Sequence, residues 1–313
     1  MTLKFLIIGD LHGEIPNISK SDLEDIHAII AVGDFCSDAL KKYMFRSLRL
    51  KLKYSQKQNI DNQNKKTTNK EKHWYDLTGK LKAKKLIFQS LRDGRKVLEH
   101  LNTVGQTHGI PIFIVPGNWD WTPDPESGWS FLKKNLWKDL PKGLRNIIDL
   151  DYKKLDLLDS DENKYSIIGY GVSSGPEFPP VLLGLKNKQL RKDERKAKKE
   201  YQKIYHKLSK FFKKAKKQKI RPIFLSHNVP FYTKLDKIKN KESPRDGQHF
   251  GSLIARQIIE EHQPIVCIGG HMHEHFGKCK VRKTTVINAG FGAKKHVFLD
   301  VNKNKILRIN FHK

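Results

Sequence analysis

The sequence predicts an α/β fold, in which apolar strands deliver polar side chains to the edge of a sheet. Leu3–Ile8 and Ala28–Val32 have the length and the unbroken hydrophobicity of buried strands. Ser252–His262 shows the periodicity of an amphipathic helix. Ligands bind such sheets at the carboxyl ends of the strands, so the residues that follow each strand are the first candidates for a functional site.

The size and composition of the chain fit a soluble globular protein. Its 313 residues can bury a large core, as one large domain or two small ones, and 37% of them are hydrophobic. No apolar run approaches the ~18 residues of a transmembrane helix. The first apolar run ends in Asp10 and lacks a signal-peptide cleavage site, so we interpret it as a first strand and not as a signal peptide. Cys36, Cys267 and Cys279 are too few for a disulfide framework and fit a reducing cytoplasm, where we expect the protein.

The net charge of +28 is concentrated in two segments. Residues 41–100 hold 18 Lys/Arg against 5 Asp/Glu, and residues 186–219 hold 16 against 3, whereas the rest of the chain is almost neutral. A genome-wide bias or a high-temperature habit would spread the lysines along the chain, so a local cause is favoured. We expect a basic surface there, suited to nucleic acid or to anionic lipid.

Both basic segments are predicted as insertions in a single domain that spans residues 1–313. In the first, Lys41–Lys53 is typical of a basic helix and residues 54–73 of a polar, low-complexity loop, and helical periodicity resumes near Lys80. In the second, lysines surround one apolar helical face formed by Tyr201, Ile204, Tyr205, Leu208, Phe211, Phe212 and Ala215. This face is expected to pack against the body of the protein.

Further apolar runs predict the remaining strands. They cover residues 110–115, 147–150, 165–169, 222–225, 264–268, 281–287, 296–301 and 305–311. Five of all these strands end next to residues that can bind metals, namely Asp10, His12, Asp34, Asn118, His227, His271 and His273. Five independent strand ends would rarely carry such residues by chance, so we predict that they meet in one site.

The ligand atoms of this set are oxygen and nitrogen, which suit Mn, Fe, Zn, Co or Ni and argue against Ca or a thiolate Zn site. There are too many ligands for one ion. Asp34 placed between two ions would give a pair roughly 3.5–4 Å apart, the geometry of two-metal phosphoesterases. We therefore expect two divalent metal ions as cofactors, with Mn the best supplement in vitro.

The motifs around these residues resemble those of the calcineurin-like metallophosphoesterases. They are Asp10-Leu11-His12, Gly33-Asp34, Gly117-Asn118-Trp119-Asp120, Ser226-His227 and Gly270-His271-Met272-His273. The resemblance spans residues 3 to about 301 and implies a four-layer αββα sandwich, two mixed β-sheets flanked by helices. Loops 231–236 and 247–252 are similar to those of an archaeal-type, Icc-like branch of the family.

The resemblance also implies how the ligands are shared between the ions. One ion would take Asp10, His12, Asp34 and His273, and the other would take Asp34, Asn118, His227 and His271. A hydroxide held by both would attack phosphorus in line, and the phosphate-ester substrate would bind both ions. Asp38 is assigned to the residues that surround the ligands.

One residue departs from the family pattern. The third motif commonly has a histidine after its Asn, and here Trp119 stands in that place. An indole has an N–H donor but cannot exchange a proton at neutral pH. The chain thereby loses acid help worth roughly 10²–10⁴-fold for poor leaving groups. Relatives with this histidine replaced tend to act on phosphodiesters, so the resemblance favours diesters over monoesters. Trp119 is a candidate to stack on a base or an aromatic leaving group, and Asn118 and Asp120 are candidate catalytic residues.

The loop before the last helix offers further candidates. His249 is a candidate substitute acid, with a surface histidine as the alternative. Gly251 and Ser252 open a helix whose N–H groups are suited to hold a substrate phosphate. Asn288-Ala289-Gly290 matches a family motif that we interpret as structural.

The sequence as a whole therefore predicts a cytoplasmic phosphodiesterase with a dinuclear metal site. Two alternatives stay open. One is a phosphomonoesterase or a nuclease whose basic insertions bind nucleic acid, and the other is a catalytically silent scaffold on the same fold. Every ligand position is filled, which favours an enzyme.

Overall fold

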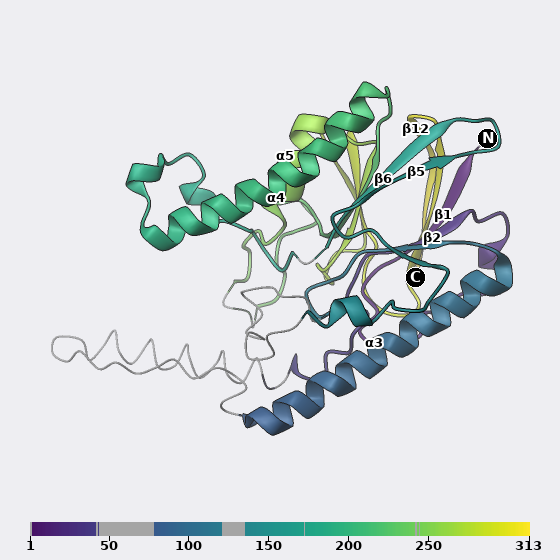
Figure 1. Ribbon diagram of the computed structural model, residues 1–313, viewed down its shortest axis with the longest axis horizontal. Helices are drawn as coiled ribbons and strands as arrows, with labels where there is room; N and C mark the ends of the chain where they lie inside the picture. Colours follow the sequence, from purple (N-terminus) through teal and green to yellow (C-terminus); the bar gives the residue numbers. More distant parts are fainter. Residues whose placement is uncertain are drawn as a thin grey trace.

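The protein is a sandwich of two mixed six-stranded β-sheets with helices on the outer faces (Figure 1). This computed structural model describes residues 2–41, 43, 78–120, 135–171, 173–241, 243 and 245–313. The predicted four-layer α/β fold is confirmed. Apart from Lys41 and Tyr43, the helix expected at 41–53 and the loop expected at 54–73 lie outside the described residues.

The first sheet has the strand order β12-β11-β1-β2-β3-β4. Its strands are β1 Leu3–Ile8, β2 Ala28–Ala31, β3 Ile112–Ile114, β4 Ile147–Asp149, β11 His296–Asn302 and β12 Lys305–His312. The strands from β1 to β4 pair in parallel, whereas β11 and β12 are antiparallel additions. The carboxyl ends of β1, β2 and β3 therefore lie along the same edge of the sheet.

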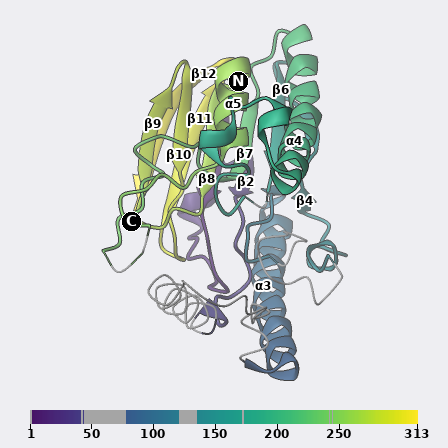
Figure 2. The ribbon, with the colours of Figure 1, turned by 90° about the vertical axis from the view of Figure 1, so that its left-hand side faces the viewer.

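The second sheet has the order β5-β6-β7-β8-β10-β9. Its strands are β5 Lys154–Leu158, β6 Lys164–Tyr170, β7 Ile223–Asn228, β8 Val266–Gly270, β9 Gly277–Val281 and β10 Thr284–Asn288. The four central strands are parallel, and β5 and β9 are antiparallel strands at the two margins. Figure 2 shows β9, β10 and β8 side by side, with β9 outermost.

Both faces of β1 are buried, which explains why this strand is apolar throughout. Phe5 and Ile7 point into the core between the two sheets. Leu6 and Ile8 point the other way, into the core beneath the helix that covers the first sheet. A continuous apolar run therefore marks a strand that lies between two layers.

Helix α3, Lys80–His108, covers the outer face of the first sheet. It buries Ala83, Ile87, Leu98 and Leu101 in the same core cluster as Leu6. Residues 80–100, expected as part of an insertion, thus form most of a helix that belongs to the sandwich itself.

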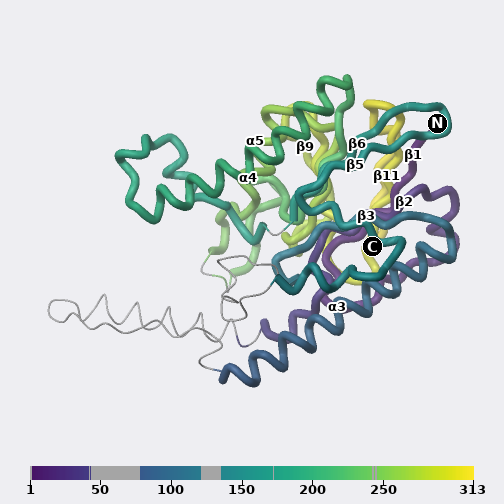
Figure 3. Tube along the Cα trace, viewed as in Figure 1, coloured from purple at the N-terminus to yellow at the C-terminus, as the bar shows by residue number. Residues whose placement is uncertain are grey.

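Helices α4, Lys192–Lys217, and α5, Leu253–His262, cover the second sheet. The expected apolar face of α4 is buried at Tyr201, Tyr205, Leu208, Phe212 and Ala215. The Phe212 ring stacks on His262 of α5, with centroids 5.3 Å apart. The second basic segment is therefore docked through its apolar face, and α3 and α4 lie on opposite sides of the strands (Figure 3).

Two strand predictions differ from the structure. Residues 281–287, expected as one strand, contain a hairpin turn, because Arg282 adopts a left-handed φ of 51° between β9 and β10. Strand β5 was not predicted, since it is a partly exposed margin strand that lacks an apolar run. Within the described part of the chain, no helix combines the length and the hydrophobicity that crossing a membrane requires.

Candidate metal centre

The ends of five strands from both sheets supply the candidate ligands. Strand β1 leads to Asp10 and His12, β2 to Asp34, and β3 to Asn118. His227 is the last residue but one of β7, and β8 leads to His271 and His273. Because these strands end on the same side of the sandwich, the side chains from the two sheets converge into two overlapping groups.

The first group is Asp10, His12, Asp34 and His273, whose ligand atoms all lie within 4.8 Å of one another. The Nε2 atoms of His12 and His273 are 3.2 Å apart, and His273 Nε2 is also 3.2 Å from Asp10 Oδ2. The two imidazoles and the Asp10 carboxylate thus face one point, as the ligands of a common ion would.

The second group is Asp34, His227 and His271. The Nε2 atom of His227 lies 3.5 Å from Asp34 Oδ2 and 2.9 Å from Asn118 Oδ1, so Asn118 adjoins this group. Asp34 is the only residue common to the two groups found among the described residues, and its carboxylate lies between them.

Three of the ligands occupy left-handed backbone conformations. The φ angles are 46° at His12, 54° at Asp34 and 64° at His271. Each such residue costs about 1–3 kcal/mol, and the surrounding structure must hold it in place. The strand ends therefore turn sharply at the residues that face the centre.

Backbone groups orient the ligands. The His227 ring donates from Nδ1 to the carbonyl of Val32, 2.8 Å away, which leaves Nε2 to bind an ion. The amide of His271 donates to Asp10 Oδ2 at 2.6 Å, and that of Trp119 donates to Asp34 Oδ1 at 2.8 Å. Each carboxylate thus keeps a fixed direction before any ion is bound.

The electrostatics of the centre favour cations. Burial lowers the pKa of His12 to about 4 and that of His271 to about 3, so both are neutral ligands at neutral pH. Burial, together with the charges of Asp10 and Asp120, raises the pKa of Asp34 well above its ordinary value. Asp10 Oδ1 is buried without a hydrogen-bond partner among the described residues. Two divalent ions would offset this cost, so the residues fit a dinuclear metal centre.

Comparison with known families identifies the family of the protein. The profile of the calcineurin-like phosphoesterases matches residues 3–275. The chain belongs to this family. Its members are hydrolases that act on phosphate esters and depend on two metal ions, which agrees with the two ligand groups.

Solved structures with a similar arrangement include three hydrolases. A putative 5′-nucleotidase from Staphylococcus aureus is 13% identical with a TM-score of 0.45. The match covers 100% of this chain and 54% of that protein. The sulfate thiohydrolase of Thermus thermophilus has 13% identity and a TM-score of 0.40, and the match covers 99% of this chain and 56% of that protein. The phosphopantetheinyl hydrolase of Mycobacterium tuberculosis has 8% identity and a TM-score of 0.43, and the match covers 92% of this chain and 89% of that protein.

The chain thus spans about half the length of the first two of these proteins. Among curated proteins, no sequence matches it.

Two aromatic rings border the first ligand group of this family member. The Trp119 ring lies edge-on to His12, with centroids 6.1 Å apart. The Phe291 ring stacks on His273 at 4.3 Å and lies 5.4 Å from His12. Sequence reasoning missed Phe291, although it directly follows the Asn288-Ala289-Gly290 motif. That motif is buried, and Gly290 accepts a hydrogen bond from the Asp10 amide through its carbonyl.

Asp120 lies behind the ligands and connects two of their loops. Its carboxylate accepts from the amide of Cys36 at 2.9 Å and from the amide of Gly117 at 2.7 Å. Burial raises its pKa to about 6. The side chain is fully buried, so it positions the loops after β2 and β3 from a place that no substrate reaches. Asp38 is partly exposed and pairs with Lys41 at 3.4 Å.

The structure places His249 beside a buried carboxylate. The ring donates from Nδ1 to Asp236 Oδ1 at 2.7 Å, and the Tyr232 ring lies 4.6 Å away. Asp236 also accepts from the amide of Gly251 at 3.0 Å. An Asp–His pair of this kind leaves the Nε2 atom of His249 for other partners.

The donors that we expected to hold a substrate phosphate are engaged elsewhere. The half-buried carboxylate of Glu177 accepts from the Ser252 hydroxyl and from the amides of Leu253 at 2.8 Å and Ile254 at 3.2 Å. The start of α5 is therefore capped within the protein, and the Gly251 amide is bonded to Asp236. The structure thus leaves Gly251 and Ser252 no N–H group directed at a substrate, which corrects the sequence-based expectation.

Proposed function

We propose that the protein is a metal-dependent phosphodiesterase. The proposal rests on the two groups of metal ligands that share Asp34. They occur in a member of the calcineurin-like phosphoesterase family. Two divalent ions bound there would supply an activated water and neutralise the charge on phosphate oxygens. The residues of the chain then hold the ions, orient the phosphate and exclude competing water.

The proposed ligand sets follow the two groups. Asp10, His12, Asp34 and His273 would hold one ion, and Asp34, Asn118, His227 and His271 would hold the other. We propose Mn as the ion that best supports activity in vitro, because oxygen and imidazole ligands suit it. The loops that carry Asp236 and His249 support placing the protein in the archaeal-type branch, and its free cysteines support a reducing cytoplasm.

The preference for diesters rests on Trp119. Its amide is bonded to Asp34, so its indole occupies the position next to the metal ligands where the family commonly has a histidine. The indole cannot donate a proton to a leaving alcohol. We propose His249, held by Asp236, as the candidate acid that protonates a leaving oxygen from another side.

The test compares two substrates on the Mn-loaded protein. Bis-p-nitrophenyl phosphate is expected to turn over faster than p-nitrophenyl phosphate, and Trp119→His is expected to narrow this ratio by at least tenfold, since a histidine can transfer protons. A wild-type preference for the monoester would overturn the subclass. A purified protein with full metal content but no activity on either substrate would support the scaffold alternative.

A second function, binding of nucleic acid, is favoured by the outer face of α4. With its apolar face docked, the helix exposes ten lysines to solvent, namely Lys192, Lys196, Lys199, Lys203, Lys207, Lys210, Lys213, Lys214, Lys216 and Lys217. Contacts with many phosphates would make binding fall steeply with salt. A salt titration with single-stranded DNA tests this, and replacing Lys196, Lys210 and Lys213 by Gln is expected to reduce the salt slope. An unchanged salt slope would exclude the exposed lysines of α4 as the surface that binds nucleic acid.

A further inference from the structure

Residues 179–185, in the connection between β6 and α4, present apolar side chains to solvent. The segment contains the short helix η5, Pro180–Leu182. Val181 is 85% exposed, Leu183 is 37% exposed, and the two prolines before Val181 are exposed as well. Exposed apolar surface that forms a patch is a feature of sites that bind a protein or a membrane. We propose that this segment, called the apolar tip below, inserts into the surface of an anionic lipid bilayer.

The apolar tip has a defined structure. Phe178 before it and Leu190 after it are buried in the core beneath α4. Leu185 within it packs against the same core, and its carbonyl accepts from the ammonium group of Lys198 of α4. Val181 is therefore exposed by a loop that is anchored on both sides, and the protein presents this side chain without a rearrangement.

The apolar tip also projects from the body of the protein. Figures 1 and 3 show the chain before α4, in teal-green, beyond the first turn of that helix and past the ends of the strands. A segment that projects in this way can contact a flat surface such as a bilayer, which a recessed loop could not.

Basic residues directly follow the apolar tip. Residues 178–192 contain no Asp or Glu, and their four cations are Lys186, Lys188, Arg191 and Lys192. Arg191 pairs with Glu194 at 2.8 Å, and the three lysines are exposed. Cations beside apolar side chains suit an anionic bilayer, because the head groups attract the lysines while the apolar side chains enter the acyl boundary.

Two other occupants match these residues less well. A nucleic acid would pair with the lysines, but the aliphatic side chains of Val181 and Leu183 offer no ring on which a base can stack. A second copy of the chain would bring two sets of the same cations together, which like-charge repulsion disfavours. An anionic bilayer matches both the charge and the apolar surface. The proposal does not depend on the proposed reaction.

The first experiment measures co-sedimentation of the full-length protein with vesicles of phosphatidylglycerol and phosphatidylcholine. Val181→Ser/Leu183→Ser is expected to weaken binding at least tenfold, because burial of these side chains drives insertion. The matched control is Leu158→Ser/Leu307→Ser, at side chains that are 64% and 58% exposed on the margin strands β5 and β12. It should stay within twofold of wild type, and vesicles of phosphatidylcholine alone should bind wild type at least tenfold more weakly.

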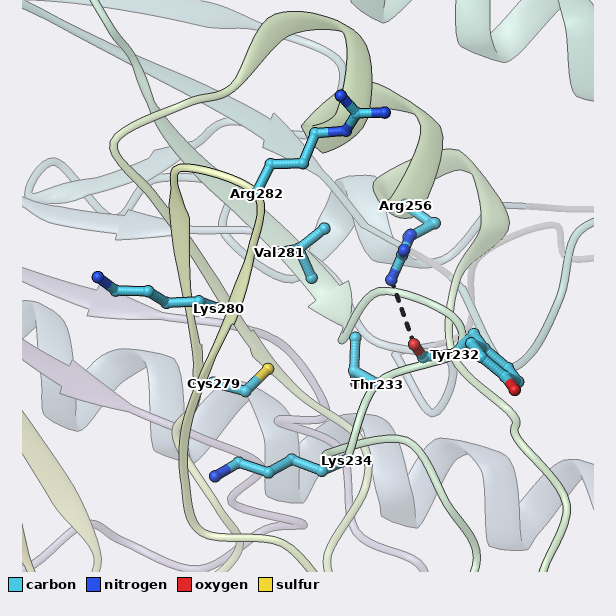
Figure 4. Close-up of a pocket in the computed structure, with 8 residues that line it drawn as sticks. All are labelled: Tyr232, Thr233, Lys234, Arg256, Cys279, Lys280, Val281 and Arg282. Atoms are coloured by element: carbon cyan, nitrogen blue, oxygen red, sulfur yellow. Dashed lines mark hydrogen bonds between the residues drawn. The ribbon is translucent and has the colours of Figure 1, made fainter.

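The second experiment tests the charge beside the apolar tip. Lys186→Gln/Lys188→Gln should weaken binding to the anionic vesicles at least fivefold. The matched control is Lys234→Gln/Lys280→Gln, at exposed side chains that point away from the shallow hollow that they help to line (Figure 4). These two residues belong to neither the tip nor α4, so the control should stay within twofold of wild type.

A fluorescent label measures insertion directly. Val181→Cys, made in a Cys279→Ser protein and labelled with the environment-sensitive dye NBD, should become brighter and shift to shorter wavelength when anionic vesicles are added, because the label leaves water. The same label at Leu158→Cys should not respond. Cys36 and Cys267 are buried, so they do not compete for the label.

Equal binding of wild type and Val181→Ser/Leu183→Ser to anionic vesicles would overturn the proposal, and so would an unresponsive label at Val181→Cys. An equal loss of affinity for single-stranded DNA in the double variant would instead assign the tip to nucleic acid. Self-association of wild type that the double variant abolishes would assign the tip to a contact between copies. Hydrolysis of bis-p-nitrophenyl phosphate without vesicles should be the same in all variants, which separates failure of this proposal from failure of the proposed function.

Discussion

At the scale of single residues, the metal centre is defined by Asp34. It belongs to both ligand groups, it is buried, and its backbone is held in a left-handed conformation. Its pKa is raised well above the ordinary value by burial and by the nearby carboxylates of Asp10 and Asp120. A carboxylate in this environment is stabilised chiefly by cations, so Asp34 and the proposed ions depend on each other.

Replacing Asp34 by Asn removes the shared charge. We expect the content of bound metal to fall by at least half and kcat for bis-p-nitrophenyl phosphate to fall roughly 100-fold or more, because both ions lose a ligand. Mass spectrometry of the purified protein and steady-state kinetics measure the two effects. Asp25→Asn, at an exposed aspartate that pairs with Lys4, serves as the control and should change neither.

Gly33, next to Asp34, allows the approach of the two sheets. Its φ is 102°, and a Cβ atom there would lie 2.7 Å from His227 Nδ1 and 2.5 Å from the Gly117 amide. Gly33→Ala should therefore lower both metal content and Tm. Gly143 has a similar φ of 80°, and an added Cβ there would have no atom of the described residues within 4 Å, its chain neighbours apart. Gly143→Ala should therefore cost only the ~1–2 kcal/mol of the left-handed backbone. Equal losses in the two variants would mean that the contact with His227 is unimportant.

At the scale of elements, buried and half-buried carboxylates connect segments that are distant in sequence. Glu177 caps the start of α5, Asp120 joins the loops after β2 and β3, and Asp236 holds the loops on both sides of His249. Asp151, after β4 of the first sheet, accepts from the amide of Gly171 after β6 of the second. Each contact satisfies backbone donors at a place where the sheets and helices meet.

Asp151 gives a pH dependence of stability. Burial is the main cause that raises its pKa from 3.8 to about 6, so the folded protein binds this proton more tightly than the unfolded chain. The contribution of Asp151 to the free energy of unfolding therefore falls as pH rises from about 4 to about 6, and is constant above that.

The variant Asp151→Asn isolates this contribution. It keeps an oxygen that can accept from Gly171 and removes the charge. Urea unfolding at several pH values should show the variant gaining stability relative to wild type between about pH 4 and pH 6, by up to about 3 kcal/mol. A difference that does not change with pH would contradict the prediction.

At the scale of the whole molecule, two sheets meet where their strands carry metal ligands. The first sheet contributes Asp10, Asp34 and Asn118, and the second contributes His227 and His271. Bound ions would therefore connect the two sheets, and their removal should weaken the contact between the layers as well as abolish activity.

Chelation tests this connection. Treatment with EDTA is expected to lower Tm by roughly 5 °C or more, because ions that bind only the folded state stabilise it, and added Mn²⁺ should restore the loss. Differential scanning fluorimetry measures the shift. Asp34→Asn should show a much smaller response to EDTA, and an equal response in both proteins would place the stabilising ion elsewhere.

Local sequence patterns suffice to identify the strands that are buried on both faces and the polar residues that follow them. Continuous apolar runs identify such strands because both of their faces are enclosed, as in β1. Residue types at strand ends also indicated metal chemistry, because only a few side chains bind metal ions.

The packing of the layers sets which side chains meet and which are already bonded within the protein. Nothing in the local pattern shows that Glu177, 75 residues before Ser252, occupies the start of α5. The same holds for Phe291 beside His273 and for the pairing of His249 with Asp236. These contacts depend on how the layers pack, and packing joins residues according to their position in space, which periodicity along the chain does not record.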